Sequence, residues 1–186
     1  GTVVRVERHG HKFHSYILST GHMSNAVGTI AYVEFFYQDG QKLDKPLRVK
    51  GKVAHKLDSH EYGKDFSVIK IKTNFRPAYI PIAKKAPSFP FVGKSLGCDA
   101  GSEPKSYSVL AYRNSDIGLV TMFNTPYPGR SGGGLIHNGE LVAVCWGGFY
   151  ICDEGFWSFF RKSGLFTTHD TITKSLSKSK YAFLLP

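Results

Sequence analysis

Ser131 lies in the run Pro128–Gly134, in which four of the seven residues are glycine, and it is the chain's clearest candidate for covalent chemistry. A serine hydroxyl is a weak nucleophile at neutral pH, so it needs a base that takes its proton during attack and returns it to the leaving group. That base, usually histidine, needs a further group to orient it. A glycine-serine turn alone is a modest signal, because flexible loops use the same residues. Whether Ser131 is a nucleophile therefore depends on finding the base and the orienting group elsewhere in the chain.

The run is followed by Leu135-Ile136, a turn and the apolar stretch Leu141–Gly147. A Gly-x-Ser-Gly-Gly segment that leads into an apolar strand, a hairpin turn and a Val-x-Trp-Gly strand resembles the nucleophile segment of trypsin-like serine proteases. Gly129–Cys145 is similar in particular to bacterial trypsin-like peptidase domains. The resemblance implies an oxyanion hole made by the N–H groups of Gly129 and Ser131, and the bend this requires is easiest where side chains are absent.

The family carries a histidine and then an acid upstream of its serine. Tyr16–His22 resembles the apolar strand and small-residue turn that end on the family's catalytic histidine. Asp65–Ile71 resembles its acid, which is followed at once by an alternating strand. The resemblance therefore predicts a serine endopeptidase with Ser131 as nucleophile, His22 as general base and Asp65 as the residue that orients the imidazole and stabilises its charged form.

The substrate is expected to be a protein or peptide, with no cofactor and no metal. By resemblance it would bind in extended form along Cys145-Trp146-Gly147, where edge pairing adds a strand and Trp146 walls the cleft. The specificity pocket would be lined by Gly147-Gly148 and Thr125. Because Thr125 stands where trypsin carries an acid, we expect an apolar or small side chain in this pocket, without a strong preference for Arg or Lys.

Three features depart from the family pattern. Arg130 stands where digestive proteases carry an Asp that pairs with a freshly cleaved N-terminus, so that activation switch cannot operate here. Cys145 replaces a serine that supports the acid of the triad, and sulfur makes weaker hydrogen bonds than oxygen. Only 21 residues precede His22, about one strand fewer than in the secreted enzymes. An N-terminal strand is therefore expected to be missing or to come from outside this chain.

Short strands must position these residues. Apolar or alternating runs separated by turn residues recur along the chain, and Asp39-Gly40 and Asn138-Gly139 supply the positive φ of tight hairpins. We expect one helix, near the C-terminus, capped by Thr168 and with Ile172 and Leu176 on one face. The predicted fold class is all-β, and the resemblance implies two packed antiparallel β-barrels of chymotrypsin type with the active site in the cleft between them.

The domain division follows from a proline-rich stretch. Four prolines between residues 76 and 91 interrupt the strand pattern, since proline lacks a ladder donor. We place the connection between the two domains in this stretch. The N-terminal barrel, residues 1–82, then carries His and Asp, and the C-terminal barrel, residues 83–186, carries Ser and ends in the helix.

The composition indicates the cellular compartment and bears on membrane insertion and nucleic-acid binding. The three cysteines are an odd number without the paired spacing of a zinc site, which favours free thiols and a reducing compartment such as the cytoplasm. The longest apolar stretches are strand-sized, and no signal peptide or membrane span is expected. The net charge of +10 would suit nucleic acid, but the basic residues are scattered, so we expect an ordinary solvated surface.

Three alternatives stay open. His9, His11 and His14 have a spacing that could hold a transition metal, although Gly10 between them marks a hairpin turn. The chain could be a protease-like binding module, catalytically weak or inactive, whose basic surface contacts a partner. An esterase would use the same acyl-enzyme chemistry, but the α/β-hydrolase order of serine, acid and histidine is contradicted by a histidine that precedes the serine.

Overall fold

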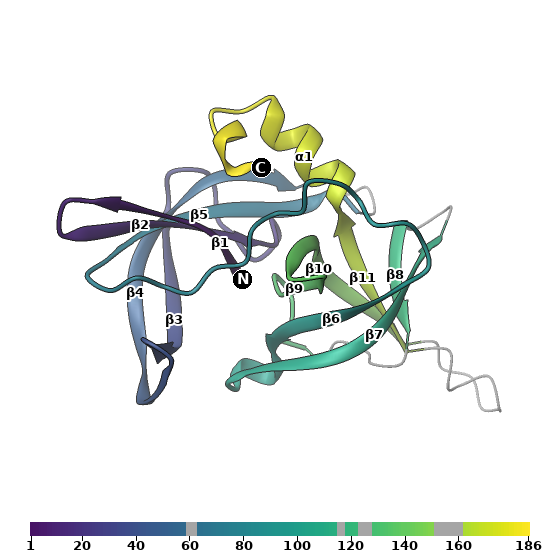
Figure 1. Ribbon diagram of the computed structural model, residues 1–186, viewed down its shortest axis with the longest axis horizontal. Coiled ribbons are helices and arrows are strands. Elements are labelled where there is room, and N and C mark those ends of the chain that lie inside the picture. Colours follow the sequence, from purple (N-terminus) through teal and green to yellow (C-terminus); the bar gives the residue numbers. More distant parts are fainter. Residues whose placement is uncertain (59–62, 115–117, 123–127, 151–161) are drawn as a thin grey trace.

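The computed structural model describes residues 1–58, 63–114, 118–122, 128–150 and 162–186. Its strands form two groups, a five-stranded sheet and a closed six-stranded barrel, as Figure 1 shows. Between them, residues 74–90 form no strand, and Ile82 makes only an isolated bridge to Leu141. The prolines of this segment explain the interruption, as the sequence predicted. The exact boundary between residues 82 and 83 stays a prediction.

The N-terminal strands form a sheet with the order β1-β2-β5-β4-β3, and all its pairs are antiparallel. Its strands are β1 (Thr2–His9), β2 (Lys12–Ser19), β3 (Ile30–Gln38), β4 (Gln41–Asp58) and β5 (Asp65–Thr73). The predicted hairpins at Gly10 and at Asp39-Gly40 are confirmed, and each of these three residues has positive φ. Within the described residues, the edge strands β1 and β3 do not pair with each other, so this half is an open sheet.

The C-terminal strands close into a barrel with the order β10-β11-β8-β7-β6-β9. Its strands are β6 (Phe91–Cys98), β7 (Pro104–Asn114), β8 (Gly118–Met122), β9 (Gly134–His137), β10 (Glu140–Tyr150) and β11 (Lys162–Thr168). Asn138 and Gly139 have φ of 50° and 80° and join β9 to β10 by the predicted two-residue turn. The 3₁₀ turn η1 (Asp99–Gly101) follows β6.

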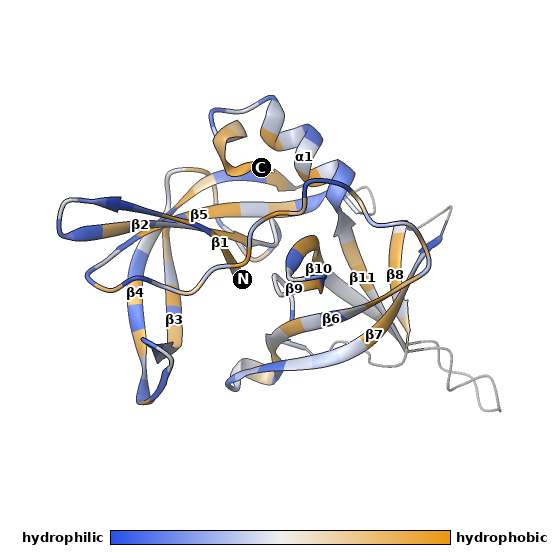
Figure 2. Cartoon of the chain, viewed as in Figure 1, coloured by the Kyte–Doolittle hydropathy of each residue, from blue (hydrophilic) through white to orange (hydrophobic). Residues whose placement is uncertain are grey.

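Two clusters of buried apolar side chains hold these elements together. One fills the barrel around Phe166 and Leu135, and the other lies where Leu18 and Phe66 of the sheet meet the C-terminal segment. Figure 2 shows hydrophobic residues recurring along the barrel strands and on the helix. Burying each large apolar side chain contributes roughly 1.5–3 kcal/mol, so these clusters dominate the stability.

The expected helix is α1 (His169–Ser177), and the 3₁₀ turn η3 (Ala182–Leu184) follows it. The Thr168 hydroxyl caps α1 by accepting from the Thr171 N–H at 3.3 Å. Ile172 and Leu176 are 1% and 0% exposed and belong to the cluster that joins the sheet to the C-terminal segment. The predicted all-β class with one short C-terminal helix is therefore confirmed.

Candidate active site

Antiparallel pairing of β2 with β5 brings His22 and Asp65 together. Ser19 at the end of β2 pairs with Ser67 of β5, so the turn after β2 lies beside Asp65, the first residue of β5. The imidazole Nδ1 contacts Asp65 Oδ2. Asp65 is buried, whereas the His22 side chain is 46% exposed. With Nδ1 directed at the carboxylate, Nε2 is the ring nitrogen left to accept a proton.

The backbone of the same turn also holds the Asp65 carboxylate. Its Oδ1 accepts from the N–H of Gly21 at 2.5 Å and from the N–H of His22 at 2.9 Å. Bonds between a charged carboxylate and backbone N–H groups are stronger than neutral ones. The acid therefore fixes the backbone of the turn as well as the imidazole that the turn carries.

Three hydroxyl groups brace this arrangement, and sequence reasoning did not identify them. Ser24 and Ser67 both donate to the Thr20 carbonyl, at 3.0 and 2.9 Å, and their hydroxyls lie 2.7 Å apart. The Thr167 hydroxyl of β11 donates to the Asp65 carbonyl at 2.7 Å and accepts from the Asp65 N–H at 3.3 Å. Only the position of Ser67, two residues after Asp65 on one face of a strand, carries a signal in the sequence.

Ser131 lies in a tight turn whose backbone is bonded to β10. The Gly132 N–H donates to the Cys145 carbonyl at 2.7 Å, and the Cys145 N–H donates to the Gly133 carbonyl at 2.8 Å. A side chain on Gly132 would place Cβ 2.3 Å from Ser19 Oγ, at the end of β2. The Ser131 turn therefore packs directly against the strand that leads to His22.

The two predicted oxyanion donors are the backbone N–H groups of Gly129 and Ser131. Within the described part of the chain, the N–H groups of Gly129 and Ser131 make no hydrogen bond. Gly129 has φ of +96°, a conformation that favours glycine. Unpaired N–H groups at a turn are what an incoming oxyanion requires.

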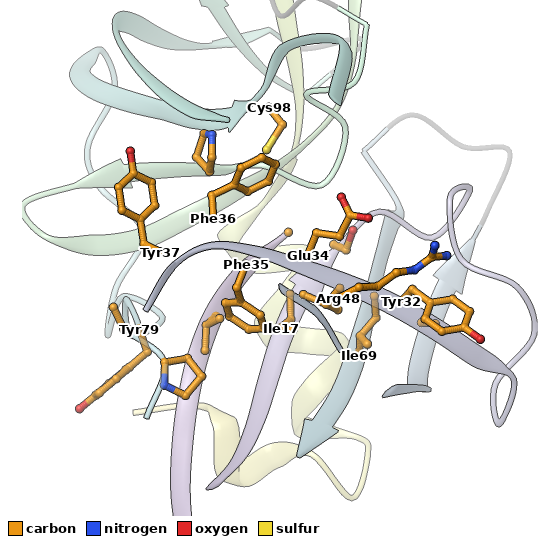
Figure 3. Close-up of a pocket in the computed structure, with 18 of the residues that line it drawn as sticks. Ile17, Tyr32, Glu34, Phe35, Phe36, Tyr37, Arg48, Ile69, Tyr79 and Cys98 are labelled. Carbon is orange, nitrogen blue, oxygen red and sulfur yellow. The ribbon is translucent and has the colours of Figure 1, made fainter. Parts of the chain in front are cut away.

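A hollow of about 1150 Å³ opens from the Ser131 turn toward the first sheet. Ser131 and Gly129 line one end, and side chains of β3 line much of the remainder. In the close-up of Figure 3, Phe36 of β3 lies beside Cys98, while Phe35 turns toward Ile17. The side chains of His22 and Asp65 are outside this lining.

The predicted substrate strand of β10 carries a bulge at Trp146, where the register with β11 shifts between Cys145 and Gly147. Both backbone groups of Cys145 already bond with the Ser131 turn, so only the second lone pair of its carbonyl is left for a substrate. Gly148 is exposed. A peptide paired with this edge would therefore use Gly147 and Gly148 first, and Thr125 lies outside the described residues.

Cys145 does not support the acid by a side-chain bond. Its Sγ lies 3.7 Å from the Gly147 carbonyl and donates to it. Burial raises the pKa of Cys145 to about 12, so the thiol stays neutral at physiological pH. In this chain the Thr167 hydroxyl of β11, rather than residue 145, reaches Asp65 from the barrel.

The histidines of the metal alternative, His9, His11 and His14, all lie on the β1–β2 hairpin. The rings of His9 and His14 stack with centroids 4.2 Å apart on the β1–β2 hairpin. Among the residues described, no group of three or more His, Cys, Asp or Glu side chains could hold a metal ion. In the same residues, no helix is both long and apolar enough to span a membrane.

The sequence matches no protein-family profile and no curated protein. The structure is similar to the crystal structure of the Rv3671c protease in its inactive form, with a TM-score of 0.58 and 15% sequence identity. The superposition covers 90% of this chain and 79% of that one. At this identity the likeness concerns the fold alone: a closed β-barrel packed with a second β-sheet in the chymotrypsin-like arrangement of a protease.

Proposed function

We propose that this chain is a serine endopeptidase that hydrolyses peptide bonds through an acyl-enzyme. The observation that carries the proposal is the contact of His22 Nδ1 with Asp65, whose carboxylate also accepts from two backbone N–H groups of the turn that carries the histidine. A fixed imidazole with Nε2 available is the base that a serine nucleophile needs. The protease-like fold agrees with this assignment.

In the proposed reaction, His22 Nε2 takes the proton of the Ser131 hydroxyl as its oxygen attacks the scissile carbonyl. Asp65 stabilises the imidazolium that forms. The N–H groups of Gly129 and Ser131 donate hydrogen bonds to the oxyanion, and His22 returns the proton to the leaving amine. A water molecule then attacks the acyl-enzyme with the same proton transfers through His22, and this regenerates the Ser131 hydroxyl.

The proposed substrate is an extended polypeptide that pairs with β10 at Gly147 and Gly148. Thr125 stands where trypsin carries an acid, so this position brings no negative charge to the proposed specificity pocket. We therefore propose that it takes apolar or small side chains rather than Arg or Lys. The net charge of +10 would also oppose binding of basic segments at low ionic strength.

A digest of a peptide library tests both parts of the proposal. The native chain should cleave peptides after apolar or small residues, and Ser131→Ala should abolish cleavage. Exclusive cleavage after Arg or Lys would refute the pocket assignment. A folded native chain that cleaves nothing would favour the alternative of a protease-like binding module.

A further inference from the structure

The side chain of Arg130, the residue before the proposed nucleophile, is buried against the η1 turn, β6 and β7. It is 1% exposed, although Lys and Arg almost never bury fully without partners. Its Nη1 donates to Asp99 Oδ1 at 3.0 Å, and its Nη2 donates to the Ser95 carbonyl at 2.7 Å. Longer contacts of 3.4 Å reach Ser95 Oγ and the Lys105 carbonyl, and the guanidinium carbon lies 4.6 Å from the centre of the Tyr107 ring.

Asp99 is held from a second side by the Tyr107 hydroxyl, which donates to Oδ2 at 2.7 Å. Burial alone would raise the pKa of Asp99, but the hydrogen bonds from Tyr107 and Arg130 and the positive charge of Arg130 lower it overall. The Asp99 carboxylate is thus charged at neutral pH and balances the positive charge of the buried guanidinium. Removing one partner of such a pair leaves an uncompensated charge in the interior.

The η1 turn that carries Asp99 also holds the other end of the nucleophile loop. The Ala100 N–H donates to the Pro128 carbonyl at 2.7 Å. A Cβ on Gly129 would lie 2.8 Å from Ala100 N and 3.0 Å from the Cys98 carbonyl, so the two backbones are in close contact. Ala100 itself has φ of +50°, a strained value for alanine that surrounding contacts must maintain.

These contacts place both anchors of the loop on one three-residue turn. Pro128 is bound through its carbonyl and Arg130 through its side chain. The N–H of Gly129 lies between the two anchors, and the N–H of Ser131 directly follows the second; neither has an acceptor in the described chain. A shift of the η1 turn would therefore move the N–H of Gly129 relative to that of Ser131.

We propose that Asp99 and Arg130 are positioning residues that keep the N–H groups of Gly129 and Ser131 aimed at one oxyanion. This inference rests on the proposed function, because it assigns a role in the same reaction. It explains why a fully buried arginine stands next to the nucleophile. The pair presets the oxyanion hole within a single folded chain.

The test uses Asp99→Asn, which keeps the side-chain shape and removes the charge. Glu103→Gln is the matched control, because Glu103 lies in the same connection between β6 and β7 but pairs with Lys42, at 2.6 Å on the surface. Fluorophosphonate titration to completion counts the active sites, and kcat and KM are then measured per titrated site. Removal of one oxyanion donor lowers kcat by about 10²–10³ in other hydrolases. We expect a displaced donor in Asp99→Asn to lower kcat per site by about 10–100-fold, with KM within about twofold.

Glu103→Gln should leave both constants unchanged, and Asp99→Glu should recover part of the lost kcat. A merely structural pair would reduce the number of titrated sites and leave kcat per site as in the native chain, and that result would overturn the inference. A native chain that neither labels nor cleaves would refute the proposed function instead.

If Asp99→Asn does not fold, Tyr107→Phe makes a smaller change, because it removes only the hydroxyl that donates to Asp99. Its kcat per site should fall about two- to tenfold with KM unchanged, and a native kcat would overturn the inference.

Discussion

The Thr167 hydroxyl of β11 links the barrel to the proposed acid, and Thr167→Val removes it with little change of shape. Thr167 is 0% exposed and makes two hydrogen bonds to the Asp65 backbone, at 2.7 and 3.3 Å. A typical internal hydrogen bond contributes about 0.5–1.5 kcal/mol, so the two together contribute about 1–3 kcal/mol. For a chain of this size, the melting temperature should fall by about 2–12 °C.

Thr121 supplies the matched control. It lies on β8, which pairs with β11, and it is also 0% exposed, but its hydroxyl has no hydrogen-bond partner within the described residues. Thr121→Val should therefore leave the free energy of unfolding unchanged or raise it. Urea unfolding followed by circular dichroism measures both variants. Equal destabilisation by the two substitutions would refute the view that the bonds to Asp65 stabilise the fold.

Three further outcomes are expected. Asp65→Asn removes the charge beside the imidazole and should lower kcat on a peptide substrate by about 10⁴-fold, and a fall of less than tenfold would contradict the assigned role. Burial raises the pKa of Cys145 to about 12, whereas the pKa of an unfolded cysteine is about 8.5. The folded state therefore holds this proton more tightly, and the stability contributed by the neutral thiol is lost as pH rises from about 8.5 toward 12. Urea unfolding at about pH 8 and 10.5 should show a larger loss in the native chain than in Cys145→Ala, and equal losses would contradict this. Gly129→Ala, whose Cβ would lie 2.8 Å from Ala100 N, should slow fluorophosphonate labelling at least tenfold, by analogy with the loss of an oxyanion donor, whereas Gly139→Ala, with open space around it, should not.

Local chemistry made the turns and the helix predictable from sequence. Asn138-Gly139 supplies positive φ between two apolar strands, and the Thr168 side chain caps the helix that begins at the next residue. Such signals act within a few residues and need no knowledge of the fold. The positions of the three predicted hairpins, at Gly10, Asp39-Gly40 and Asn138-Gly139, and of α1 therefore agreed with expectation.

Long-range contacts were harder to predict. Arg130 was recognised as a departure from the family pattern, but nothing in the sequence linked it to Asp99, because that pairing depends on how η1 packs against the nucleophile loop. The support of Asp65 by Thr167 was missed for the same reason, since β11 and β5 lie far apart in the chain. Such contacts depend on tertiary packing that periodicity does not encode.

Labelling by a fluorophosphonate tests the central assignment most directly. We expect native protein to label at Ser131 at neutral pH, Ser131→Ala to remain unlabelled, and His22→Ala to label far more slowly. A native chain that is demonstrably folded and yet stays unlabelled would contradict the assignment of Ser131 as a nucleophile activated by His22.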